Sequence, residues 1–140
     1  ARYYRRERGL AGLRTPHADT ARRPALELAQ AAQAAAQPDL PEAIRRLAAV
    51  RASSAALQHG DYAEVHVAPQ QFAFLRSTPD EQVLVVLNAA DEPAELNLKL
   101  PFQNARLIDL LNPGAEFRAQ NLTAAVTAPP RWARIMSVTT

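Results

Sequence analysis

The pattern of apolar and polar positions is clearest at residues 83–87, where five apolar residues (VLVVL) follow one another. Turn-forming residues flank this run on both sides, at 79–81 and at 91–93. A run this short and rich in β-branched residues predicts a strand, and its lack of polar alternation predicts that both faces are covered. We therefore expect Leu84, Val85, Val86 and Leu87 all to be buried. Residues 71–76 and 82–88 are predicted to form an antiparallel hairpin.

From Tyr62 onward the chain consists of short apolar or alternating runs separated by turn residues, such as Pro69, Pro79 and the Asn-Pro-Gly at 112–114. Regular short strands of this kind are typical of a β-sandwich. The predicted fold class is therefore mainly β, an antiparallel Greek-key-type sandwich preceded by a helical segment. The expected strands cover residues 62–68, 71–76, 82–89, 94–99, 106–110, 116–118, 122–127 and 133–138.

The N-terminal part predicts helices instead. Residues 39–57 have apolar residues at helical spacing, with Asp39 as a candidate N-cap and Glu42 three positions later, as in a capping box. Residues 25–37 have high helix propensity, but their apolar face is mostly alanine. Residues 1–24 indicate loop, with one short strand at Tyr3 and Tyr4. The expected domains are a helical arm, 1–60, and a sandwich, 61–140.

Charge divides at the same place. Residues 1–60 carry a net charge of +5 and residues 61–140 a net charge of −3. The basic half lacks interleaved aromatic residues or a binding motif, so nucleic acid is not an expected partner. No apolar run approaches the roughly 20 residues of a membrane span, which argues against a membrane partner. No signal peptide is apparent, which favours the cytoplasm, and the chain has no cysteine.

Five segments occur in a fixed order: 45–51 (RRLAAVR), 55–62 (AALQHGDY), 72–76 (FAFLR), 83–88 (VLVVLN) and 129–135 (PPRWARI). Together they resemble the C-terminal part of the α-amylase family of glycoside hydrolases, from the last barrel helix through the β-sandwich called domain C. Upstream, residues 3–10 (YYRRERGL) resemble the family's segment at the end of the eighth strand of its (β/α)8 barrel. Residues 19–24 (DTARRP) resemble a loop of its oligosaccharide-cleaving members, although the usual Met and Trp positions hold Ala25 and Glu27.

This resemblance implies an enzyme that cleaves α-glucosidic bonds with retention, using two carboxyl groups about 5 Å apart. In the family these groups lie before the segment matched by residues 3–10, so no catalytic residue is expected in this chain. The candidates for substrate contact are Tyr4, Glu7 and Arg22. A replacement carboxyl pair of Glu7 and Asp19 is disfavoured against surface and loop-capping roles.

Other polar residues have structural explanations. His17, His59 and His66 are too scattered to form a metal site, so neither a metal nor a cofactor is expected. Asp91, Glu92 and Asp109 are expected to be solvated at turns and strand ends, and Asn88 to satisfy backbone groups in the following turn. Trp132 is expected to pack rather than to stack on a sugar.

The leading hypothesis is the C-terminal β-sandwich domain of an α-amylase-type enzyme acting on α-glucans or oligosaccharides. Its expected partner is the rest of the barrel enzyme, in the same or a separate chain, with an α-glucan oligosaccharide as a further candidate. The sandwich would support the barrel without catalysis of its own. Two alternatives remain open: a free-standing carbohydrate-binding or protein-interaction sandwich, and an excised fragment without a separate function.

Overall fold

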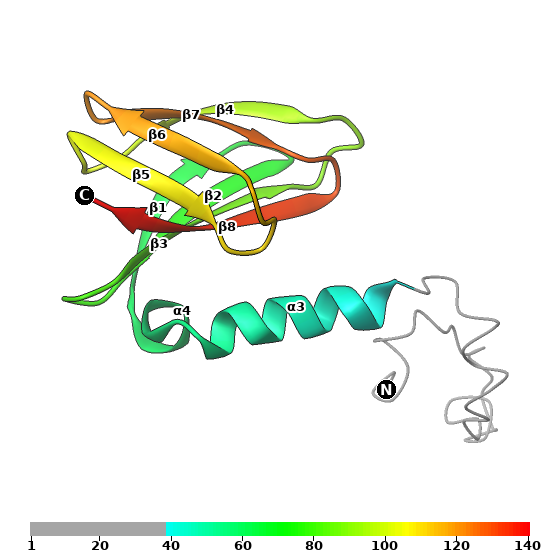
Figure 1. Ribbon diagram of the computed structural model, residues 1–140. Coiled ribbons are helices and arrows are strands. Elements are labelled where there is room, and N and C mark those ends of the chain that lie inside the picture. Colours follow the sequence, from blue (N-terminus) through cyan, green and yellow to red (C-terminus); the bar gives the residue numbers. More distant parts are fainter. Residues whose placement is uncertain (1–38) are drawn as a thin grey trace, which may run out of the picture. The chain divides into compact units, whose positions relative to one another are not determined.

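The computed structural model describes residues 39–140, and within them two helices precede eight strands (Figure 1). The expected helix over 25–37 and strand at Tyr3 and Tyr4 lie outside the described residues. Contacts divide the chain into two compact units, Ala1–Ala48 and Ala49–Thr140. The elements are α3 Leu40–Ala52, α4 Ala55–His59, β1 Asp61–Val67, β2 Gln71–Ser77, β3 Gln82–Asn88, β4 Ala94–Lys99, β5 Asn104–Asp109, β6 Glu116–Gln120, β7 Thr123–Ala128 and β8 Trp132–Thr139.

All eight strands belong to one antiparallel sheet with the order β1-β2-β3-β8-β5-β6-β7-β4. The sheet folds over, so that β5, β6, β7 and β4 form a layer facing β1, β2, β3 and β8 (Figure 1). The terminal strands β1 and β4 also come into contact. The predicted antiparallel sandwich is therefore confirmed, with the refinement that its two layers are halves of one continuous sheet.

The core lies between the two layers. It combines Leu84, Val86 and Met136 of one layer with Leu98 and Leu107 of the other, all with no exposed surface. Small residues of the second layer, such as Ala124, complete the packing. Because each strand alternates its faces, every second residue of these strands points into this core. The predicted hairpin of β2 and β3 is also confirmed, with Leu75 paired to Leu84.

The strand β3 is covered on both faces for most, but not all, of its length. Leu84 and Val86 face the sandwich core, while Val83 and Val85 pack on the other face against Ala56 of α4. These four side chains are at most 6% exposed. Leu87 is 38% exposed, so the prediction that it is buried was wrong. The reason is that Leu87 lies on the same face as Val83 and Val85 but is not part of the cluster packed around Ala56.

The expected single helix over 39–57 is two helices, and this prediction was therefore wrong. Ser54 has extended backbone angles (φ −124°, ψ 117°), and its hydroxyl accepts a hydrogen bond from the Leu57 amide at 3.1 Å. This N-cap starts the new helix α4. Glu81, in the turn before β3, accepts a hydrogen bond from the Ala56 amide at 2.8 Å and ties α4 to the sheet. In α3, which has no buried residue, the Glu42 carboxylate pairs with Arg45.

Candidate functional site

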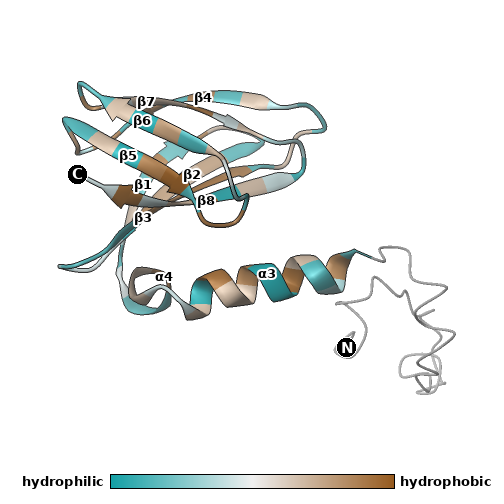
Figure 2. Cartoon of the chain, in the orientation of Figure 1, coloured by the Kyte–Doolittle hydropathy of each residue, from teal (hydrophilic) through white to brown (hydrophobic). Residues whose placement is uncertain are grey.

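The candidate site is the face of β1, β2, β3 and β8 that points away from the sandwich core, which we call the outer face. The strand register places Val67, Phe72, Leu87 and Ala133 side by side across the four strands. A second row contains Glu64, Phe74, Val85 and Ile135. Hydrophobic and hydrophilic bands alternate along the strands (Figure 2), yet on β2 and β3 both faces are apolar. The outer face is therefore an apolar surface spanning four strands.

Three aromatic rings lie together on the outer face. The Phe74 ring is 5.4 Å from the Tyr62 ring and 5.5 Å from the Phe72 ring, measured between centroids, with tilts of 34° and 38°. Tilted contacts at these distances are favourable arrangements for aromatic pairs. Phe72 and Phe74 are half-buried, while Tyr62 is 54% exposed. The cluster forms a continuous aromatic strip that is open on its Tyr62 side.

Helix α4 covers one part of the outer face and leaves another open. Ala56 is fully buried against Val83, Val85 and Ile135. Beyond this contact, Val67 is 62% exposed and Leu87 is 38% exposed. Isolated exposed apolar residues are common, but these two lie in one row on either side of the half-buried Phe72, and a contiguous apolar patch indicates an interaction surface. The open part of the outer face is therefore the best candidate for docking within the described residues.

A buried polar cluster stands at the end of β5. The Asp109 carboxylate accepts hydrogen bonds from the amides of Leu111 and Asn112, from the Asn112 side chain at 2.8 Å and from Arg134 at 2.9 Å. Asp109 is only 4% exposed, so the expectation that it is solvated was wrong, although its role in a turn holds. Its charge is compensated by Arg134, whose guanidinium also lies over the Phe117 ring. Both oxygens of this carboxylate accept hydrogen bonds from the protein, so its role is structural.

Trp132 and Asn88 have the structural roles that were predicted. Trp132 is half-buried against the α4-facing cluster, and its indole N–H donates to the Asn112 amide oxygen at 2.8 Å. The Asn88 amide nitrogen donates to the carbonyl oxygens of Glu92 at 2.8 Å and Pro129 at 3.1 Å, and its oxygen accepts from the Ala90 amide. Asp91 and Glu92 are exposed, as expected. These residues hold turns and form no site.

The predicted substrate contacts Tyr4, Glu7 and Arg22 lie outside the described residues, as do His17 and Asp19. Of the other histidines, His66 is half-buried and His59 is exposed. In residues 39–140 no three His, Cys, Asp or Glu side chains gather as a metal-binding group. The two helices of that same segment lack the length and apolar character needed to cross a bilayer.

The outer face was not predicted as a site. A signal was present, because Phe72 and Phe74 alternate with Ala73 and Leu75, so that both faces of β2 are apolar. One face fills the sandwich core, and the other needs a second cover that α4 supplies only in part. The class that the fold and this surface define is an antiparallel β-sandwich domain with a short helix on a partly covered apolar outer face.

The family comparison agrees with this class. Residues 63–135 match the family described as maltogenic amylase, C-terminal domain, and the chain belongs to that family. No curated protein matches the chain.

Solved structures with the same fold are α-amylase-family enzymes. An Anoxybacillus α-amylase is 20% identical with a TM-score of 0.77, over 97% of this chain and 28% of that chain. The α-amylase of Geobacillus thermoleovorans, solved with acarbose, is 16% identical with a TM-score of 0.67, over 74% and 23%. The maltogenic α-amylase AmyB of Thermotoga neapolitana is 17% identical with a TM-score of 0.63, over 76% and 27%. The chain thus spans about a quarter of the length of these enzymes.

Proposed function

We propose that this domain docks through its outer face onto the catalytic barrel of an α-amylase-type glycoside hydrolase and stabilises that barrel. The observation that carries the proposal is the row of Val67, Phe72 and Leu87 on the outer face, in which Val67 and Leu87 are exposed and Phe72 is half-buried. Family membership supports the choice of partner, because most of the length of the related enzymes lies outside the part that this chain matches. Within the proposal, residues 1–60 are the end of the barrel and residues 61–140 the sandwich.

The apolar residues on α3 support the same proposal. Ile44 is 42% exposed and Leu47 is 38% exposed, and no residue of α3 is buried. A helix with exposed apolar side chains at helical spacing is typical of one that packs on a neighbouring element. In the proposed enzyme, α3 is the last barrel helix, and its apolar residues are covered by the barrel. The substrate of the complete enzyme is proposed to be an α-glucan or an oligosaccharide derived from one.

A single substitution measured in two contexts tests the docking. In the chain alone, Val67→Ser should change the free energy of unfolding little, because the side chain is 62% exposed. In a chimera of the Anoxybacillus α-amylase whose C-terminal part is replaced by residues 39–140, Val67 should be covered. The same substitution should then cost about 1–2 kcal/mol, the range for losing a buried aliphatic side chain. Thermal melts of both proteins measure the difference.

Leu122→Ser is the matched control for this experiment. Leu122 is also exposed, at 44%, but lies in the β6–β7 turn, away from the outer face. It should have the same small effect in the chain and in the chimera. Equal effects of Val67→Ser in both contexts would contradict the docking. We also expect no hydrolysis of maltodextrin by the chain alone, and turnover that is lost in Glu7→Gln would contradict this.

A second candidate function is carbohydrate binding by the chain alone, and the Tyr62–Phe74–Phe72 strip is the observation that favours it. Aromatic rings with one exposed member can stack on a sugar face. Affinity electrophoresis in gels containing soluble starch distinguishes the two functions. Retardation of the chain that is lost in Tyr62→Ala supports binding, whereas unchanged migration supports a docking role alone.

A further inference from the structure

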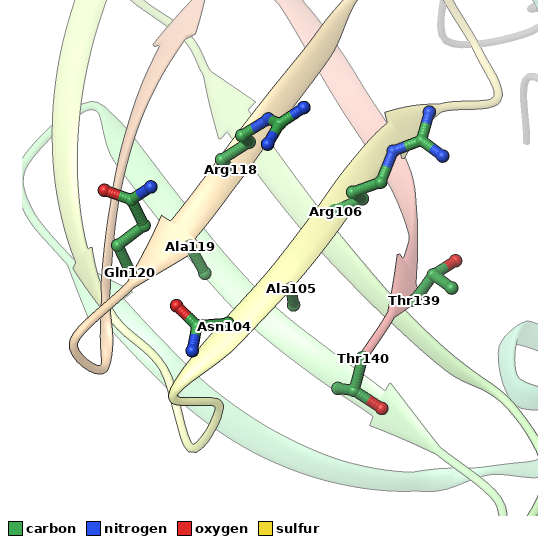
Figure 3. A pocket seen from close by; sticks show the side chains of 8 residues that line it. All are labelled: Asn104, Ala105, Arg106, Arg118, Ala119, Gln120, Thr139 and Thr140. Atoms are coloured by element: carbon green, nitrogen blue, oxygen red, sulfur yellow. The ribbon is translucent and has the colours of Figure 1, made fainter.

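A pocket lies across β5, β6 and β8, apart from the apolar rows of the outer face. Its volume is about 290 Å³, and Figure 3 shows the side chains that surround it. Small-molecule pockets usually measure roughly 300–1,000 Å³, so this one suits a ligand at the small end of that range. The lining residues are Asn104, Ala105, Arg106, Arg118, Ala119, Gln120, Thr139 and Thr140.

The strand register brings two arginines together in this pocket. Arg106 of β5 is directly opposite Arg118 of β6, and on its other side it pairs with Thr139 of β8. Like charges directly opposite each other across two strands destabilise a sheet. Two positions further along the two strands, Asn104 is opposite Gln120, and both of these side-chain amides also line the pocket (Figure 3). Four side chains rich in N–H donors thus surround one shallow volume.

A neighbouring carboxylate compensates only one of the two positive charges. Glu116 accepts two hydrogen bonds from Arg106, from Nε and from one terminal nitrogen, each at 2.9 Å. This contact lowers the pKa of Glu116 and raises the pKa of Arg106. The charge of Arg118 also lowers the pKa of Glu116. Among residues 39–140, however, no hydrogen bond or ion pair holds the Arg118 guanidinium, so its five donors remain free for a ligand.

We propose that this pocket binds a small molecule through an oxyanion, with a sugar-sized phosphate monoester as the class that fits its volume. The Arg118 guanidinium is a planar fork that matches the oxygens of a phosphate. The Asn104 and Gln120 amides and the Thr139 hydroxyl supply donors and acceptors for the uncharged part of the ligand. No aromatic residue lines the pocket, so aromatic stacking does not contribute to recognition there.

NMR titration of the isotope-labelled chain at constant ionic strength tests this proposal. The probes are glucose 6-phosphate, inorganic phosphate and, as the uncharged counterpart, glucose. The expected result is saturable shifts at the amides of Ala105, Ala119 and Thr139 with both phosphates and none with glucose. Tighter binding of glucose 6-phosphate than of inorganic phosphate would support the sugar-sized class, and equal binding would reduce the site to an oxyanion site and overturn that part of the proposal.

Three variants locate the binding. Arg118→Gln should weaken it about tenfold or more, the loss expected for hydrogen bonds to a charged group. Arg51→Gln removes the same charge from an exposed position on α3 and should change nothing. Glu116→Gln should tighten binding, because it removes a negative charge and releases Arg106. Shifts spread over all surface arginines, no saturation, or equal binding by the wild type and Arg118→Gln would overturn the proposal.

Discussion

The two leucines of β3 allow a direct test of how this strand is covered. Leu84 is fully buried in the sandwich core, whereas Leu87 is 38% exposed on the outer face. Truncating each to alanine removes the same atoms from two different environments. Because the substitution is the same at both positions, the difference between the two losses of stability measures how far each side chain is buried.

The expected magnitudes differ severalfold. Leu84→Ala leaves a closed cavity between the two layers and should lower the free energy of unfolding by about 2–5 kcal/mol. Leu87→Ala loses only part of the roughly 1.5–3 kcal/mol that full burial of a leucine contributes, and solvent fills the space, so about 1 kcal/mol is expected. Each kcal/mol corresponds to roughly 4 °C in the melting temperature of a domain of this size.

Urea denaturation of the isolated chain, with circular dichroism as the readout, measures both losses. The slopes of the transitions should be equal, so that the midpoints alone report the stability change. Val85→Ala provides an internal check, because Val85 lies on the same face as Leu87 but under α4. A loss at Leu87 as large as at Leu84 would refute the reasoning, since it would mean that the open part of the outer face is covered in the chain itself.

The remaining predictions concern polar and backbone contacts. Asp109→Asn should destabilise the fold by about 3–5 kcal/mol, measured by chemical denaturation, because Arg134, whose side chain is only 14% exposed, is left without its counter-charge; a loss below 1 kcal/mol would contradict this. Gly60→Ala should cost about 1–3 kcal/mol in thermal melts, because a Cβ there would lie 2.6 and 2.8 Å from two backbone oxygens, and an unchanged melting temperature would contradict it. Carbon-detected NMR should show Glu116 titrating below its ordinary pKa, because Arg106 donates to the ionised form. Its pairing then stabilises the fold at pH values above the ordinary pKa and is lost as the pH falls through the lowered one, and an unshifted titration would contradict the ion pair.

The strands could be predicted from the sequence because each is a short apolar run between turn residues. The hairpin of residues 71–76 and 82–88 is an example, since its two strands are close in the chain and Ser77 to Glu81 supply the turn. The break in the helix at Ser54 was missed, although a serine that precedes an apolar turn is a known N-cap signal. The residues on both sides of that serine, within 39–57, have helical propensity, so propensity alone does not show the break. The contact that ties the second helix to the sheet, the hydrogen bond from the Ala56 amide to Glu81, joins residues 25 positions apart in the sequence.

The sites depend on register, which the sequence does not show. Arg106 and Arg118 each occupy a polar position in a strand whose buried and exposed residues alternate. Only the pairing of β5 with β6 places them opposite each other. The burial of Asp109 likewise depends on Arg134, which lies 25 residues later in the sequence, on the neighbouring strand β8. The exposure of Leu87 depends on where α4 ends, and five consecutive apolar residues contain no information about that. Long-range pairing is therefore what limited the prediction of the sites.

The position of β8 has a consequence for synthesis of the domain. Of the eight strands, β8 is synthesised last, and it is the strand that joins β3 to β5 in the middle of the strand order. Until it emerges, the earlier strands can form only two separate sheets, β1-β2-β3 and β5-β6-β7-β4, whose unpaired edges can associate with other chains. Folding of the sandwich is thus held back until β8 has emerged, and it depends on contacts between residues distant in sequence, which are slow to form. A nascent chain stalled within residues 132–139 would expose the open edges of both β3 and β5 at once.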